Sequence, residues 1–162
     1  MFYKMRRKAQ ELSFEETEAV LLRGTSGILA LAGDKAFPYA VPLSYVYDGE
    51  HIYFHSALTG HKIDAIRQNP NASFAVIDQD EVIPEKYTSA YRSVIVFGSV
   101  RIIEDEEEKL ASIRKLAVRY APNNTEQRHT DEIERQWDRF CMIEMSIAHM
   151  TGKEGRVLAE KR

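Results

Sequence analysis

The stretch that decides the fold reads YAVPLSYVYDGEHIYFHSALTGHK and covers residues 39–62. It holds two runs rich in β-branched and aromatic residues, one on each side of Asp48-Gly49. An Asp-Gly pair between two such runs predicts a β-hairpin, because both residues tolerate the positive φ angles of a tight turn. GILALA at 27–32 and the turn candidate GDKAF at 33–37 precede it, so we expect an antiparallel meander with strands at 27–32, 38–47 and 51–57.

Two residues interrupt the strand pattern. Pro42 lacks an amide hydrogen, so we expect it at a sheet edge or a bulge, where a missing ladder bond is tolerated and a ligand can approach the backbone. Gly98 lies inside the longest β-rich run, YRSVIVFGSVRII at 91–103, and predicts a bulge or close packing at that point.

Helices are expected before, between and after the strands. Ser13 and Glu16 form a capping-box pattern for a helix over 14–23, which Gly24 would end. Thr59 is a candidate N-cap for a helix over 59–69. The other expected elements are strands at 72–78, 91–103 and 141–151, helices at 104–120 and 131–139, and a polar connection at 79–90. Six strands in this order favour an α+β, mainly β fold whose antiparallel sheet closes into a small barrel with flanking helices.

Length and charge exclude several classes of protein. The 162 residues predict a single domain over 1–162. The net charge of −3 argues against nucleic acid as a partner held by phosphate neutralisation. No apolar run approaches the roughly 18 residues of a membrane span and no signal segment is evident, so we expect a cytoplasmic protein without a membrane partner. Cys141 is the one cysteine, so redox chemistry would have to come from a bound cofactor.

The segment HSALTGHK at 55–62 is the best candidate site, because a strand runs there into the start of a helix. Backbone amides, a threonine hydroxyl, a glycine and the Lys62 ammonium converge, and together they suit a phosphate or another dianion. The alternative interpretation is an ordinary capped helix with a solvated lysine.

Other candidates carry weaker signals. Arg92 and Ser93 follow Tyr91 at the start of a strand and could bind a phosphate or a ring edge, or could be an exposed strand end. Three histidines at 51, 55 and 61 lack an acidic partner at convincing spacing, so no metal site is expected. Cys141 opens an apolar strand, which is typical of a small buried residue rather than a nucleophile.

Three stretches together resemble one family: YAVPLSYVYDGEHIYFHSALTGHKIDAIRQNP at 39–70, YRSVIVFGSVRIIED at 91–105 and HMTGKEG at 149–155. In order and spacing they resemble the nitroimidazole-resistance (Nim-type) branch of the pyridoxamine 5′-phosphate oxidase-like flavin-binding split-barrel proteins. The resemblance runs from about residue 5 to 155. It implies a six-stranded antiparallel split β-barrel with flanking helices, and a homodimer with two FMN sites at its interface.

The resemblance also implies site residues. Those near the flavin ring are Val41, Pro42, Leu43 and Ser44, and those near the phosphate are His55, Ser56, Ala57, Gly60, His61 and Lys62. Ser93 and Val94 are implied as further phosphate or partner contacts, and Trp137 of the partner subunit as a neighbour of the ring. No catalytic residue is implied.

The activity implied by the resemblance is that of an FMN-dependent oxidoreductase that reduces nitro groups. A small molecule would accept the electrons, and NADH or NADPH is a candidate donor. The arginine-rich substrate signature of true pyridoxamine phosphate oxidases is absent, so that particular reaction is not expected. Two alternatives stay open: a flavin-binding module without turnover, and a split barrel that binds the deazaflavin F420 or binds haem through His55 or His149.

Overall fold

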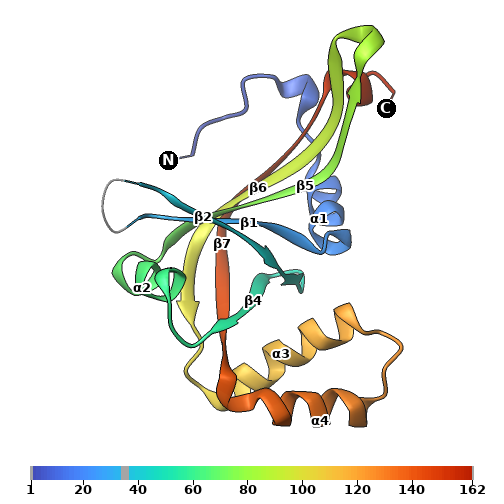
Figure 1. Cartoon of the computed structure of the whole chain (residues 1–162). Helices are drawn as coiled ribbons and strands as arrows, with labels where there is room; N and C mark the ends of the chain where they lie inside the picture. The colour runs from blue at the N-terminus through green and yellow to red at the C-terminus, as the bar shows by residue number, and fades with distance from the viewer. Residues whose placement is uncertain (1, 34–36, 162) are drawn as a thin grey trace.

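One antiparallel sheet runs through the whole molecule in the computed structural model, which describes residues 2–33 and 37–161 (Figure 1). Its strands are β1 (Ser26–Leu31), β2 (Tyr39–Ser44), β3 (Val46–Tyr47), β4 (His51–Ala57), β5 (Asn71–Ile83), β6 (Thr88–Ile102) and β7 (Phe140–Glu154). Their order in the sheet is β2-β1-β5-β6-β7-β4-β3. The turn predicted at 33–37 falls largely on residues 34–36, which lie outside the described residues.

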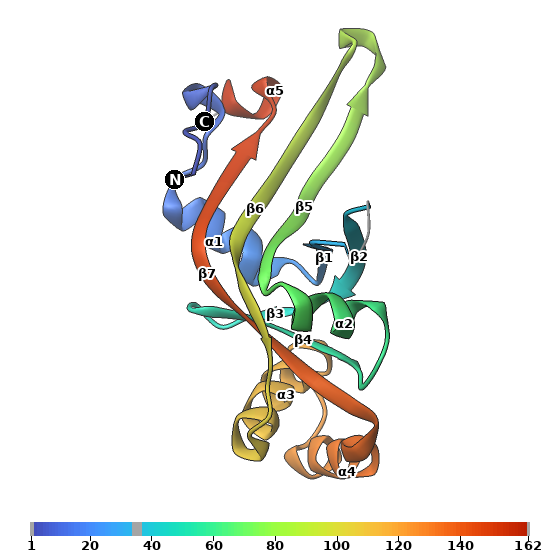
Figure 2. The same ribbon diagram turned by 90° about the vertical axis from the view of Figure 1, so that its left-hand side faces the viewer.

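In the described part of the chain, five α-helices flank the sheet: α1 (Phe14–Arg23), α2 (His61–Gln68), α3 (Glu106–Tyr120), α4 (Glu126–Gln136) and α5 (Arg156–Ala159). α3 and α4 lie together at one end of the molecule, and the hairpin of β5 and β6 projects at the other end (Figure 2). No helix in the described part of the chain is long and apolar enough to cross a membrane.

The prediction of one strand over 38–47 was wrong, because the run is divided at Tyr45. Its amide donates to the carbonyl oxygen of Thr25 (3.3 Å) and to the hydroxyl oxygen of Tyr120 (3.0 Å) instead of joining the ladder. β2 therefore pairs with β1, and β3 with β4, at opposite edges of the sheet. Within residues 2–33 and 37–161 the sheet has seven strands rather than six, and its two edges are not hydrogen-bonded to each other, so a closed barrel is not observed.

The polar connection predicted at 79–90 is also wrong. β5 and β6 stay paired as far as Ile83 and Thr88, across a short turn at Pro84–Lys86. Val82 and most of its neighbours on this ribbon are exposed. Because the ribbon extends beyond the core, its sequence lacks the alternation of apolar and polar residues that marks a half-buried strand.

Several local predictions are confirmed. The amide of Ser13 donates to the Glu16 carboxylate (2.8 Å), and the amide of Glu16 donates back to the Ser13 hydroxyl (3.1 Å), which completes the capping box. Pro42 lies on the edge strand β2. At Gly98 the pairing with β7 shifts register, and a side chain there would clash with the backbone oxygen of Ser146.

The second helix of the α3–α4 pair begins earlier than predicted. We expected it over 131–139, but Thr125 caps it by accepting from the amide of Arg128 (3.2 Å), and α4 ends at Gln136. α3 is joined to the sheet through a small apolar cluster that includes Leu116, Phe140 and Met142. This packing places α3 and α4 beside the end of β4.

Candidate functional site

The end of β4 and the start of α2 form an open turn, which we call the cradle (His55–Lys62). Gly60 caps α2 with φ 123° and ψ 175°, a conformation available essentially only to glycine. The prediction of Thr59 as the N-cap was therefore wrong, and no side chain among the described residues caps this helix. A side chain at Gly60 would meet nothing within 4 Å, so the positive end of the α2 dipole faces open space.

Lys62 supplies the positive charge of the cradle. Its side chain is half-buried, and burial lowers its pKa below the ordinary value. No carboxylate among residues 2–33 and 37–161 lies within ion-pair distance of its ammonium group. A partly desolvated cation without a counter-charge favours the binding of an anion.

Two neighbours of Lys62 are neutral near neutral pH. Burial, followed by the positive charge of Lys62, lowers the pKa of His55. Burial raises the pKa of Cys141, whose thiol donates to the carbonyl oxygen of Ala57 at 3.5 Å. Cys141 is thus a buried neutral thiol, as predicted. Ser56 is also buried, whereas Ala57 and His61 are exposed.

The start of β2 contacts the cradle. The rings of Tyr39 and His61 stack with their centroids 4.1 Å apart. Further along β2, Val41 and Leu43 pack inward against the core, while Pro42 and Ser44 are exposed on the outer face of the sheet. The structure therefore brings the predicted ring segment and the predicted phosphate segment into one neighbourhood.

Ser93 and Val94 lie far from the cradle in the same chain. Val94 is fully buried and pairs with Gly152 of β7, whereas His55 pairs with Met142. Ten residues of β7 separate these two positions, which corresponds to roughly 33 Å of extended strand. Their proposed contact with a ligand in the cradle stays a prediction that needs a second chain.

Trp137 lies close to the end of β4. Its ring packs edge-on against Phe140 at 5.9 Å, and Phe140 pairs with Ala57. The ammonium of Lys109 sits 4.2 Å from the centre of the indole ring. The predicted contact of Trp137 with the ring of a ligand bound to the other subunit also stays a prediction.

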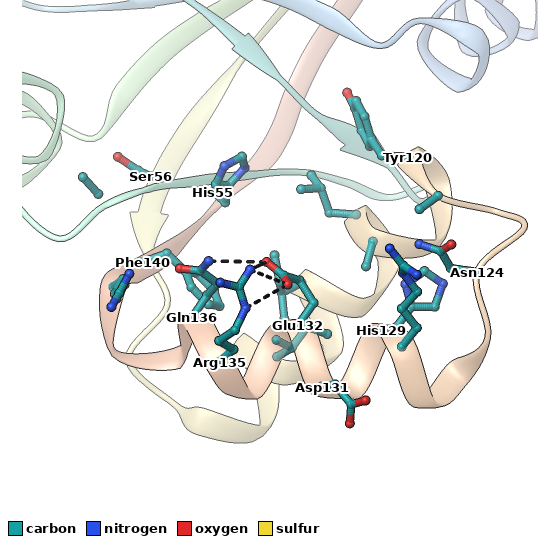
Figure 3. A pocket seen from close by; sticks show the side chains of 18 residues that line it. His55, Ser56, Tyr120, Asn124, His129, Asp131, Glu132, Arg135, Gln136 and Phe140 are labelled. Atoms are coloured by element: carbon teal, nitrogen blue, oxygen red, sulfur yellow. Dashed lines mark hydrogen bonds and ion pairs between the residues drawn. The ribbon is translucent and has the colours of Figure 1, made fainter.

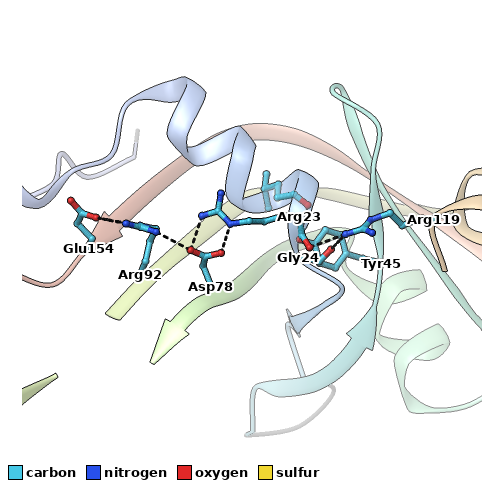
Figure 4. A network of polar contacts seen from close by, with 8 residues as sticks. Arg23, Gly24, Tyr45, Asp78, Arg92, Arg119 and Glu154 are labelled. Atoms are coloured by element: carbon cyan, nitrogen blue, oxygen red, sulfur yellow. Dashed lines mark hydrogen bonds and ion pairs between the residues drawn. The ribbon is translucent and has the colours of Figure 1, made fainter. Parts of the chain in front are cut away.

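Arg92 lies outside the cradle, in a network of charged side chains along β5, β6 and β7 (Figure 4). Its guanidinium donates to the fully buried Glu154 at 3.1 Å and to Asp78 at 3.3 Å. Asp78 also accepts two hydrogen bonds of 2.6 Å from Arg23, which, together with Arg92, lower its pKa. Because the Arg92 guanidinium already donates to both carboxylates, it is not available to bind a phosphate.

A pocket of about 860 Å³ lies between β4, α3 and α4 (Figure 3). Its walls include His55 at one side and the buried His129 of α4. This pocket was not predicted from the sequence, although Arg128, Glu132, Arg135 and Arg139 recur every three or four residues. The predicted helix began at residue 131 and therefore left out Arg128, so the full row of charged side chains on α4 was not recognised. The described residues contain no group of three or more side chains suited to a metal ion.

The chain belongs to the pyridoxamine 5′-phosphate oxidase family, whose model matches residues 13–154. The resemblance seen in the sequence is thus confirmed at the level of the family. A comparison with curated protein sequences found no relative.

Solved structures share the fold. A FAD-binding protein from Mesorhizobium loti is 30% identical, with 90% of this chain and 97% of that chain covered and a TM-score of 0.65. A candidate 5-nitroimidazole antibiotic resistance protein from Bacteroides thetaiotaomicron is 22% identical, with 89% and 86% covered and a TM-score of 0.73. A FAD- and haem-binding protein from Mycobacterium smegmatis is 19% identical, with 92% and 74% covered and a TM-score of 0.74.

Proposed function

We propose that this chain is a flavoprotein that binds FMN, with the FMN phosphate in the cradle. The observation that carries the proposal is Lys62, a half-buried ammonium without a carboxylate partner among the described residues. Membership of the family and the FAD-binding relative at 30% identity support a flavin as the ligand.

The residues of the cradle fit a phosphate dianion. Lys62 would neutralise its charge, the α2 dipole would add to the attraction, and the open space at Gly60 would let phosphate oxygens approach backbone amides. His55 would donate a hydrogen bond from a neutral ring at neutral pH. The isoalloxazine ring would extend toward Pro42 and Ser44 on the outer face of β2.

A second copy of the chain would cover that outer face. Neighbouring strands place Pro42, Ile28, Ala75 and Ile95 in one row across the sheet, and Ala40, Ala30, Ser73 and Phe97 in the next. No residue in these rows is charged, and Ile28, Ile95 and Phe97 are each more than a third exposed. Exposed apolar side chains gathered on one uncharged face of a sheet are typical of an interaction site.

The homodimer would complete each flavin site. Ser93 and Val94 are too far from the cradle within one chain, so contacts from β6 and from Trp137 of the partner subunit would come across the interface. The position of β2 and β3 at opposite edges, joined only through Tyr45, supports a split barrel whose two edges approach each other without pairing.

The proposed activity is that of a cytoplasmic oxidoreductase. A flavin held by the cradle would supply the redox chemistry between a donor such as NADH or NADPH and a small-molecule acceptor. The fold shared with a candidate nitroimidazole resistance protein supports a nitro compound as the acceptor. The chain itself would bind and orient the flavin, and the partner's surface would exclude water from it.

The absorbance spectrum of the purified protein tests the ligand directly. Flavin bands, with the mass of FMN in the material released on denaturation, are the expected result. A Soret band would instead identify the haem alternative, and the mass of F420 would identify the deazaflavin alternative.

Two further measurements test the rest of the proposal. Oxidation of NADH or NADPH with a nitroaromatic acceptor separates an oxidoreductase from a flavin-binding module without turnover. Light scattering on a sizing column should give the mass of a dimer, and a stable monomer that retains flavin would contradict the shared site.

A further inference from the structure

The pocket between β4, α3 and α4 is separate from the cradle over most of its wall. It shares His55, Ser56 and Ala57 with the cradle at one side, and its other walls come from α3, α4 and the start of β7 (Figure 3). Its volume of about 860 Å³ lies within the range of sites for small organic ligands, roughly 300–1,000 Å³. The pocket is therefore large enough for a ligand that the proposed flavin site does not account for.

The middle of the pocket is apolar. Ile113, Leu116 and Ala117 of α3 line it, together with Ile133 of α4. Phe140, which pairs with the last residue of β4, extends this apolar wall toward the sheet. These side chains can pack against an aromatic ring or a short hydrocarbon chain, so we expect a ligand with an apolar body.

His129 is a polar side chain buried beside this apolar wall. It is 6% exposed and lies one helical turn before Ile133, which is also buried. Its backbone amide donates to the carbonyl oxygen of Thr125 (3.1 Å), but its imidazole ring has no hydrogen-bond partner in the described ranges. A buried ring nitrogen without a partner is unfavourable. Because His129 lines the pocket, a polar atom of a ligand there could provide the missing hydrogen bond.

The neighbours of His129 make this end of the pocket suitable for an anion. Arg128 is exposed and lines the pocket, and its guanidinium forms no ion pair with any residue of 2–33 and 37–161. Asn124 lies at the same end as His129, beside the start of α4, and its side-chain amide can donate (Figure 3). Thr125 caps α4 between them, so the positive end of the helix dipole adds to the attraction for an anion.

The carboxylates that line the pocket do not neutralise Arg128. Asp131 accepts a hydrogen bond from Gln127 at 2.7 Å, and Glu132 accepts from Arg135 at 2.6 Å and 2.7 Å. Arg128 is thus the cation available to a ligand at the start of α4. A single cation favours a monoanion, and the planar guanidinium matches the two oxygens of a carboxylate.

We propose that this pocket binds a small organic acid, with its carboxylate at Arg128, Asn124 and His129 and its apolar body between α3 and α4. The body would extend along the apolar wall toward Phe140, and so toward the edge of the cradle. The binding residues are different from those proposed to hold the flavin. The site would therefore bind its ligand whether or not a flavin is present.

Calorimetric titration of the purified protein with three probes tests the chemistry of the ligand. Naphthoate has both the carboxylate and an apolar ring system, naphthamide has the same rings without the charge, and acetate has the charge without the rings. Naphthoate should bind about tenfold or more tightly than naphthamide, because charge-assisted hydrogen bonds are added. Acetate should bind more weakly than naphthoate, because it buries little apolar surface. Absence of naphthoate binding, or an equal affinity for either of the other probes, would overturn the proposal.

Two arginine variants locate the carboxylate within the pocket. Arg128→Ala should weaken naphthoate binding by about tenfold or more and leave naphthamide binding unchanged. Arg139→Ala is the matched control, because Arg139 is also exposed and lines the pocket, but follows the other end of α4. It should change neither affinity. An equal loss in both variants, or a loss in Arg139→Ala alone, would contradict a carboxylate site at the start of α4.

His129→Phe separates binding from stability. The variant keeps a planar ring in the buried position but removes the two ring nitrogens, so naphthoate binding should weaken while the free energy of unfolding stays the same or rises. An unchanged affinity for naphthoate would contradict the contact of His129 with the carboxylate. If this variant does not fold, Arg128→Ala still decides the question. The affinity for FMN should be the same in all three variants as in the wild type, so failure of the organic-acid site would leave the flavin proposal in place.

Discussion

Lys62 and Arg92 lie in two different regions of the molecule, and they differ in whether a carboxylate neutralises their positive charge. Arg92 donates to Glu154 and Asp78, and Asp78 is in turn held by Arg23. Lys62 is half-buried and has no carboxylate partner among the described residues. A charge neutralised inside the chain stabilises the fold, whereas a charge left without a counter-charge is available to bind a ligand.

The largest expected effect comes from removing Arg92, whose charge is neutralised by Glu154 and Asp78. Arg92→Ala removes the guanidinium from the fully buried Glu154, which should lower the free energy of unfolding by about 3–5 kcal/mol. Urea unfolding followed by circular dichroism measures the change. Arg156→Ala removes an exposed ion pair with Glu160 and should leave stability nearly unchanged. Equal effects of the two variants would contradict a structural role for the network.

Removal of Lys62, which has no carboxylate partner among the described residues, should affect ligand binding rather than stability. Lys62→Ala is expected to weaken FMN binding by about 1.5–3 kcal/mol, because a charge-assisted hydrogen bond is lost. Riboflavin, which lacks the phosphate, should bind the variant as it binds the wild type. The free energy of unfolding should change little, since no carboxylate among the described residues forms an ion pair with Lys62. An FMN affinity equal to that of the wild type would show that the phosphate lies elsewhere.

Gly60 in the cradle and Gly49 in the β3–β4 turn can be compared in the same way. Both have positive φ angles, 123° and 99°, and open space where a side chain would lie. Substitution by alanine should strain either site by about 1–3 kcal/mol. Only Gly60→Ala is expected to weaken FMN binding as well, because its methyl group would stand where phosphate oxygens approach. Fluorescence titration of both variants checks this, and an equal loss of affinity in Gly49→Ala would count against the cradle.

The smallest expected effect is on the pH dependence of stability. Hydrogen bonds from Arg23, then those from Arg92, lower the pKa of Asp78 in the folded protein. Its contribution is therefore fully present above the ordinary pKa of an aspartate and is lost as the pH falls through the lowered folded value. In Asp78→Asn, unfolding free energies measured from pH 6 downward should show a shallower loss than in the wild type. Parallel curves would mean that Asp78 is not ionised in the network.

Local features of the fold could be predicted from the sequence, because a few neighbouring residues decide them. The Ser13 capping box, the turn at Asp48-Gly49 and the bulge at Gly98 are of this kind. The break at Tyr45 could not be predicted, since it depends on the hydroxyl of Tyr120, 75 residues away. The β5–β6 ribbon was missed because strand pairing outside the core leaves no apolar pattern.

The candidate site was predictable to a similar extent. The cradle could be located from HSALTGHK, but whether Lys62 has a partner depends on which carboxylates fold near it. Arg92 shows the converse, because its partner Glu154 lies 62 residues further along the sequence. The pocket beside the cradle depends on how α3 packs on β4, which no local pattern specifies.

The most direct test of the central claim is the affinity of flavin-free wild-type protein for FMN relative to riboflavin. The two ligands share the ring and ribityl chain and differ only in the phosphate that the cradle is proposed to bind. FMN should bind about a hundredfold more tightly, as expected for a phosphate held by Lys62 and the start of α2. Equal affinities would contradict the assignment of the cradle as a phosphate site.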